Sequence, residues 1–241
     1  YYLIADADQL RWFADQVNSG NNAINAKLTT DITINSQVLD DTGELIADHD
    51  NLKSWTPIGI YNFEGEFDGD GHTISGLYVD YGTSGGVGLF GHVNGGTVRN
   101  VTLKDSYVSG SYNVGGICWY NNGGTVENCT SDCTVKGTGN ATGGICGYND
   151  KGSVRNCHNT GKVTGSFNVG GVCGRNYSSG TVNGCYNTGE VSGTRWVGGL
   201  CGNNYGGTVK GCYNIGNVSG NSEVGGVCGW NYIKTLENSY N

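Results

Sequence analysis

The chain repeats itself every 27 or 28 residues from Val87 onward. Each unit contains a Val-Gly-Gly-Val-Cys segment or a close variant. The segments begin at Val87, Val114, Thr142, Val169, Val197 and Val224. A unit this short cannot bury its own apolar face, so it must stack on its neighbours. The repeat therefore predicts a solenoid in which all units stack into one domain.

Three short apolar patterns recur within each unit. Examples are Thr125-Val126, Val191-Ser192 and the Val-Gly-Gly segment at Val197. With 45 glycines in 241 residues, the composition favours short strands separated by tight turns over regular helix. We therefore expect an all-β fold: a parallel β-helix with three strands in each coil of 27 to 28 residues, and rungs about 4.8 Å apart.

One repeat position accepts only asparagine or glycine. The equivalent residues are Asn100, Asn128, Asn156, Gly184, Gly211 and Asn238. These residue types best tolerate the left-handed backbone region, so the position predicts a sharp bend between two strands.

Two further positions are asparagine in most units. One column holds Asn121, Asn149, Asn176, Asn204 and Asn231, and the other holds Asn159, Asn187, Asn214 and Asn241. Stacked side-chain amides can hydrogen-bond from rung to rung. We interpret both columns as structural ladders.

The first part of the chain lacks the clean repeat. Leu10, Phe13, Ala14 and Val17 would share one face of a helix at residues 7–18. A solenoid needs an atypical end unit over its open core, and this helix is the expected cap. We therefore divide the single domain into a cap with irregular first coils at residues 1–84 and regular coils at residues 85–241.

The charge and the ends of the chain restrict its partners. The net charge is −8 without a basic cluster, which argues against nucleic acid or an anionic membrane as a partner. No apolar run approaches the roughly 20 residues that span a bilayer. Both ends look cut from a longer polypeptide, and a bare last coil predicts end-to-end self-association.

Several segments resemble the GLUG motif. They are the Gly-Leu-Phe-Gly at 88–91, its variants at 144–147 and 199–202, and the Asn-Thr-Gly-rich stretch at 185–193. The resemblance covers nearly the whole chain. It implies an extracellular origin, secreted or attached to a bacterial cell wall, as in adhesin-like proteins and immunoglobulin A-cleaving metallopeptidases. It carries no activity over, because the repeat is shared by proteins with different functions.

Nine of the ten cysteines occupy two repeat positions. One column holds Cys118, Cys146, Cys173, Cys201 and Cys228, and the other holds Cys129, Cys157, Cys185 and Cys212. Their spacing matches no common zinc signature. Disulfides within a coil are one alternative for an exported protein. Because Phe90 and Val101 replace cysteine in the first unit, we favour reduced thiols in the core.

Acidic residues near the amino terminus offer a catalytic alternative. Asp68 and Asp70 lie in a glycine-rich turn, and an acidic loop carries Asp40, Asp41, Glu44, Asp48 and Asp50. Such carboxylates could serve a polysaccharide lyase or glycosidase, or the loop could bind calcium as a cofactor. Elsewhere opposite charges alternate along one column, and Lys162 and Glu190 are expected neighbours. That pattern is typical of cross-strand pairing rather than catalysis.

Aromatic residues at outward positions give a binding hypothesis. The candidate ligand-binding residues are Tyr120, Tyr148, His158, Tyr186, Tyr213, Trp230 and Tyr240. Evenly spaced rings beside amides could stack on sugars or contact a protein, although tyrosine also simply suits a β surface.

These observations favour a non-catalytic surface module of a larger protein, either a stalk or an adhesin-like segment that binds a host glycan or protein. The alternatives are a polysaccharide-active enzyme and a purely structural spacer. No catalytic residue or metal ligand is assigned.

Overall fold

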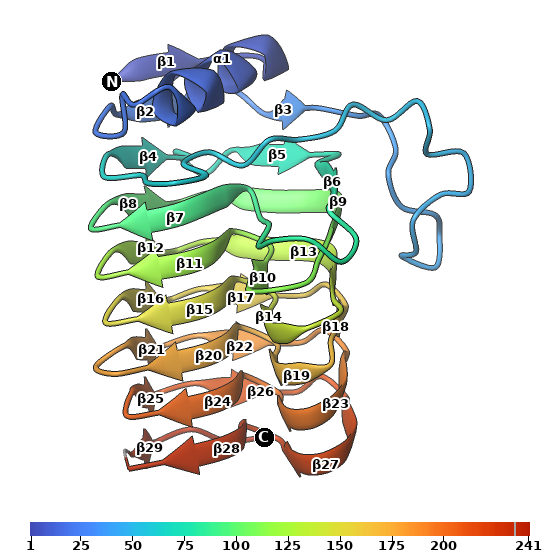
Figure 1. Ribbon diagram of the computed structural model, residues 1–241, viewed down its shortest axis with the longest axis vertical. Coiled ribbons are helices and arrows are strands. Elements are labelled where there is room, and N and C mark those ends of the chain that lie inside the picture. The colour runs from blue at the N-terminus through green and yellow to red at the C-terminus, as the bar shows by residue number, and fades with distance from the viewer. Residues whose placement is uncertain (234) are drawn as a thin grey trace.

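The computed structural model describes residues 1–233 and 235–241, and it is a parallel β-helix in which successive coils stack along one axis (Figure 1). Within these residues the strands form three parallel sheets of nine, fourteen and six strands, which we name A, B and C. The expected fold class, with three strand regions in each regular coil, is confirmed.

Sheets A and C hold the most regular strands. Sheet A contains β1 (Tyr2–Ile4), β2 (Ala26–Leu28), β4 (Glu66–Asp68), β8 (Thr97–Arg99), β12 (Thr125–Glu127), β16 (Ser153–Arg155), β21 (Thr181–Asn183), β25 (Thr208–Lys210) and β29 (Leu236–Glu237). Sheet C contains β7 (Phe90–Asn94), β11 (Cys118–Asn122), β15 (Cys146–Asp150), β20 (Cys173–Tyr177), β24 (Cys201–Tyr205) and β28 (Cys228–Tyr232).

Sheet B is less regular, because it carries the bend between its two halves. It contains β3 (Ile32–Thr33), β5 (Thr73–Ser75), β6 (Tyr78–Asp80), β9 (Thr102–Gly110), β10 (Val114–Gly115), β13 (Thr130–Gly137), β14 (Asn140–Gly143), β17 (His158–Asn159), β18 (Val163–Thr164), β19 (Phe167–Gly170), β22 (Tyr186–Asn187), β23 (Val191–Gly198), β26 (Tyr213–Asn214) and β27 (Val218–Gly225).

The helix α1 (Ala7–Asn18) covers the first coil (Figure 1). The Asp6 carboxylate caps it by accepting from the backbone N–H of Gln9 at 2.8 Å. Its buried residues are Leu10, Phe13, Ala14 and Val17, the four expected from their helical spacing. Within the described residues no helix has the length and apolarity that crossing a bilayer demands.

The asparagine-or-glycine position turns the chain as predicted. Its φ angles are 56° at Asn100, 53° at Asn128, 52° at Asn156, 63° at Gly184, 60° at Gly211 and 47° at Asn238. The structure adds a second left-handed corner that the sequence analysis missed. It is formed by Asn113, Ala141, Asn168, Trp196 and Glu223.

Both asparagine columns form buried ladders. Asn121 donates to Asn149, Asn149 to Asn176 and Asn176 to Asn204, each at 2.8 Å. In the second ladder Asn159 donates to Asn187, and Asn187 to Asn214, each at 2.7 Å. Each inner amide both donates and accepts, which satisfies polar groups that would be costly to bury alone; at the start of the ladders Asn121 Oδ1 and Asn159 Oδ1 have no partner.

Residues 35–54 form a loop that projects from the side of the stack (Figure 1). Its Glu44 Oε1 lies 2.6 Å from Lys162 Nζ, and the Thr134 hydroxyl donates to the Gly43 carbonyl. The ion pair of Lys162 is therefore made with this loop. The expected partner Glu190 lies on the adjacent rung, where its carbonyl accepts from Val163 N–H.

Candidate binding surface

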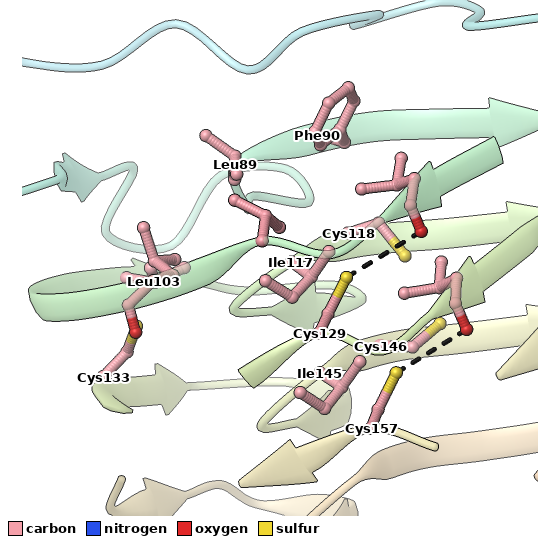
Figure 2. Packing of buried hydrophobic residues seen from close by; sticks show 14 of the residues in the cluster. Leu89, Phe90, Leu103, Ile117, Cys118, Cys129, Cys133, Ile145, Cys146 and Cys157 are labelled. Carbon is pink, nitrogen blue, oxygen red and sulfur yellow. Dashed lines mark hydrogen bonds between the residues drawn. The ribbon is translucent and has the colours of Figure 1, made fainter. Parts of the chain in front are cut away.

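None of the ten cysteines forms a disulfide; nine are buried inside the β-helix, some of them drawn in Figure 2, and Cys228 is half-buried. Cys118 and Cys146 stack in one column, and Cys129 and Cys157 stack in the other. The Cys129 and Cys157 thiols point at backbone carbonyls one coil away, at 3.8 and 3.6 Å. Burial raises the pKa of Cys133 to about 12. These thiols are core side chains, as Phe90 and Val101 at the same repeat positions led us to expect.

The two carboxylates of the glycine-rich turn are engaged in charge pairs. Asp68 Oδ2 lies 2.8 Å from Arg99 Nη2, and Asp70 Oδ1 lies 3.0 Å from Lys27 Nζ. Burial by itself would raise the pKa of Asp68, but hydrogen bonds from Asn100 and the Asp70 backbone, with the charge of Arg99, hold it below its ordinary value. A general acid needs a raised pKa, so this geometry favours a structural role for Asp68.

The acidic loop borders a cavity of about 500 Å³. Carboxylates from two coils join those of the loop in its lining, which includes Asp40, Asp41, Asp105 and Asp132. The Asp40 carboxylate already accepts hydrogen bonds from Thr42, both hydroxyl and backbone, and from the Glu44 backbone. Across the described chain, no three acidic, histidine or cysteine side chains are grouped closely enough to hold a metal ion. Calcium binding at this loop stays a prediction.

Four of the candidate binding residues form a column on sheet B. His158, Tyr186 and Tyr213 are half-buried, whereas Tyr240 is 63% exposed. The Tyr186 and Tyr213 rings are parallel within 5° and their centres are 4.9 Å apart. Since stacked rings cover each other's faces, this column presents mainly ring edges and hydroxyl groups to a partner.

The other three candidates belong to a larger surface on sheet C. Along each strand, side chains point alternately into and out of the β-helix. Two adjacent columns of outward side chains therefore run over all six strands of sheet C. We name these side chains the aromatic face; they are His92, Tyr120, Tyr148, Arg175, Tyr177, Tyr205, Trp230 and Tyr232. The repeat did not lead to a prediction for Tyr177, Tyr205 and Tyr232, although each directly follows an asparagine of the first amide column.

The side chains of the aromatic face contact one another from coil to coil. The Tyr120 and Tyr148 rings stack at 5.1 Å, and the Tyr205 and Tyr232 rings at the same distance. Between these two pairs, the Arg175 guanidinium lies 5.2 Å from the Tyr148 ring centre and 4.8 Å from that of Tyr177. The result is a continuous band of rings and one guanidinium along the side of the stack.

Trp196 extends the aromatic face at the second corner. Its φ of 56° places a bulky side chain in the left-handed region, at a cost of about 1 to 2 kcal/mol. The indole stacks on Trp230 with ring centres 5.6 Å apart, and the Arg195 guanidinium lies 4.5 Å from its ring centre. Because the same corner recurs at Ala141 and Glu223, this strain belongs to the fold, and the corner serves to place the indole beside Trp230.

Comparison with known proteins supports the reading of the repeats. Residues 110–138, 138–164 and 196–219 match the GLUG motif, so the expected GLUG repeats are present. A stretch of 54 residues is 48% identical to halomucin from Haloquadratum walsbyi; it spans 22% of this chain and 1% of halomucin.

The fold also matches a solved structure. A crystal structure from Bacteroides ovatus, of a protein proposed to be an immunoglobulin A1 protease, superposes with a TM-score of 0.74. The match covers all of this chain and 74% of that protein at 23% identity, which establishes a shared fold.

Proposed function

We propose that this GLUG-repeat β-helix is a non-catalytic module of an extracellular surface protein, and that it binds a host glycan or protein through the aromatic face. The observation that carries the proposal is the unbroken band of rings over all six strands of sheet C. Aromatic side chains combine a large apolar surface with polar edges, and they are enriched where proteins bind partners.

The location rests on the repeats and the relatives. GLUG repeats, with the similarity to halomucin, support an extracellular or surface position. A solenoid suits such a position, because stacked coils display one surface over a long distance. Attachment to a bacterial cell wall and self-association through the last coil are further parts of this proposal.

The carboxylates of the glycine-rich turn are paired with basic side chains and are not arranged as a catalytic acid and base. This arrangement favours binding over catalysis. Asp68 pairs with Arg99, and Asp70 pairs with Lys27. Further along the stack, Arg155 lies 2.6 Å from Glu127 of the preceding coil. Neutralised pairs of this kind hold adjacent coils together. An enzyme built on these acids would instead need an unpaired carboxylate facing a substrate.

The test is a triple variant in which Tyr148, Tyr177 and Tyr205 become serine. Each ring desolvated against a partner contributes about 1 kcal/mol, so the triple variant should bind roughly 100-fold more weakly. Binding is measured on an array of glycans and host extracellular proteins, with thermal unfolding as a check of folding. A second variant, with Tyr186, Tyr213 and Tyr240 changed to serine, tests the column on sheet B.

The control changes two exposed tyrosines elsewhere, Tyr61 and Tyr112, to serine. It should bind as the unchanged protein does. Absence of binding on the array, or binding indifferent to both triple variants, would favour the spacer. Turnover of a polysaccharide that disappears with Asp68→Asn would favour the enzyme.

A further inference from the structure

Besides Asn121 of the inward amide ladder, three polar side chains at outward positions of sheet C carry buried atoms without a hydrogen-bond partner. They are Asp150 Oδ1, Arg175 Nε and Asn203 Oδ1. The residues lie on three successive strands, β15, β20 and β24, and Arg175 and Asn203 are direct neighbours across their strands. A buried polar group left unpaired is unfavourable and needs an explanation, and here three occur in the two outward columns that form the aromatic face.

Arg175 is held by rings alone. In the described part of the chain the other arginines have partners: Arg99, Arg155 and Arg195 pair with carboxylates, and Arg11 donates to the Ser54 carbonyl. Arg175 has only the Tyr148 and Tyr177 rings on which it stacks. A guanidinium oriented by stacking keeps its N–H groups available to a ligand.

The two neighbouring residues supply acceptors. Asn203 is 4% exposed, and its Nδ2 donates to Asn168 Oδ1 at 2.9 Å, which leaves Oδ1 without a donor. Asp150 Oδ2 accepts from the Tyr120 hydroxyl at 3.3 Å, whereas Oδ1 accepts nothing. One unpaired donor therefore lies between two unpaired acceptors along the stack.

The charges on this face cancel. Asp150 and Arg175 carry opposite charges on adjacent strands, so an anionic ligand would meet Asp150 and a cationic one would meet Arg175. Burial lowers the pKa of His92, which keeps that ring neutral at physiological pH. A ligand suited to all three groups is uncharged and both donates and accepts hydrogen bonds. A hydroxyl group does both.

We infer that the aromatic face binds a neutral glycan, and that Asp150, Arg175 and Asn203 bind its hydroxyl groups while the exposed edges of the surrounding stacked rings pack against it. The unpaired atoms are covered by neighbouring side chains, so a sugar reaches them only when those side chains move. Arg175 is the group that can turn toward a sugar, because no ion pair holds it. This inference rests on the proposed function and specifies the class of ligand.

The experiment measures binding to a panel of neutral oligosaccharides, carboxylated and sulfated oligosaccharides, and an acidic peptide, at low and high salt. Arg175→Lys keeps the charge but loses the planar fork, and Asn203→Ala removes the acceptor. Each should weaken binding to neutral oligosaccharides about tenfold, with little dependence on salt. Arg155→Lys is the matched control, because Arg155 is paired with Glu127 on another sheet.

The failures of the two proposals are distinguishable. Binding confined to charged oligosaccharides or the acidic peptide, and weakened strongly by salt, would overturn the neutral-glycan inference. So would neutral binding that is lost in the triple tyrosine variant but unchanged by both Arg175→Lys and Asn203→Ala. Absence of all binding would overturn the proposed function as well. If Asn203→Ala does not fold, Arg175→Lys decides alone, since its side chain is only half-buried.

Discussion

The two halves of the β-helix fill their cores in different ways. Beneath α1, rings from distant segments interlock: Phe67 lies 6.0 Å from Phe13 and 5.2 Å from Phe90, and Phe63 lies 5.2 Å from Phe90. In the regular coils the same inward positions hold valine, cysteine and asparagine, each stacked on its own kind.

This difference follows from what each half must fit. A coil inside the stack has the same neighbour above and below, so a small side chain that stacks on its copy serves every rung. The capped end has one coil on one side and a helix on the other. It therefore needs unique, large side chains that close an irregular space without voids.

The largest expected effect is a loss of stability at high pH that arises from the thiols of the regular coils. All ten cysteines lie at residues 118–228, and the capped end has none. Burial raises the pKa of Cys133 from 9.0 to about 12 and those of Cys146 and Cys173 well above 9.0. Above pH 9 the unfolded chain releases protons that the folded coils retain. Stability should therefore fall as pH rises from 9 toward 12, by about 1.4 kcal/mol per pH unit for Cys133 alone.

Denaturant unfolding at several pH values measures this loss, and Cys133→Ala should make the decline shallower. Alkylation of the denatured, unreduced chain followed by mass measurement is the accompanying control, with tags expected on most of the ten thiols. Tags on two or fewer would reveal disulfides and remove the basis of the pH effect.

A second prediction compares one inward column near the cap and within the regular coils. Phe67 and Val154 belong to the same column of sheet A and both are fully buried. Phe67→Ala should cost about 3 to 5 kcal/mol of unfolding free energy, and Val154→Ala about 2 kcal/mol, because the ring leaves the larger cavity. Urea unfolding checks both values. Equal losses would mean that the coils are packed as specifically as the cap.

The smallest of these effects tests the amide ladder. Asn176→Leu keeps the branching of the side chain but removes its polar atoms, so Asn149 Nδ2 loses its ladder acceptor and keeps only carbonyls such as that of Gly152, and Asn204 Oδ1 loses its donor. We expect a loss of about 1 to 3 kcal/mol in urea unfolding. The control Asn183→Leu, at an exposed position of sheet A, should change stability by no more than about 0.5 kcal/mol. If the ladder variant is as stable as the control, the hydrogen bonds of the ladder only offset the cost of burying the amides and add no stability beyond that.

Much of the regular region could be predicted, because in a solenoid the repeat length is also the register. Residues 27 or 28 apart become direct neighbours, as Cys118 and Cys146 do. The ladders and the asparagine-or-glycine corner follow from that one relation. The second corner was missed because its residues range from Ala141 to Trp196 and Glu223, so no residue preference marks it.

The candidate site was predicted only in part. Tyr120, Tyr148 and Trp230 were identified from the repeat, and strand alternation would also have identified Tyr177. The unpaired Asn203 Oδ1 had no such signal, since an asparagine in a repeat rich in asparagine looks like every other. The ion pair between Lys162 and Glu44 joins residues 118 apart outside any period.

The sequence by itself determined the coil length, the columns, one corner and the cap, because each depends on local spacing or on an exact repeat. Only the tertiary structure decided which groups remain unpaired, which way the rings face and where the acidic loop docks. These depend on how side chains from different coils share space: Arg175 stacks between Tyr148 and Tyr177 and leaves its Nε without a partner. Such packing follows from contacts between side chains, and no repeat length encodes it.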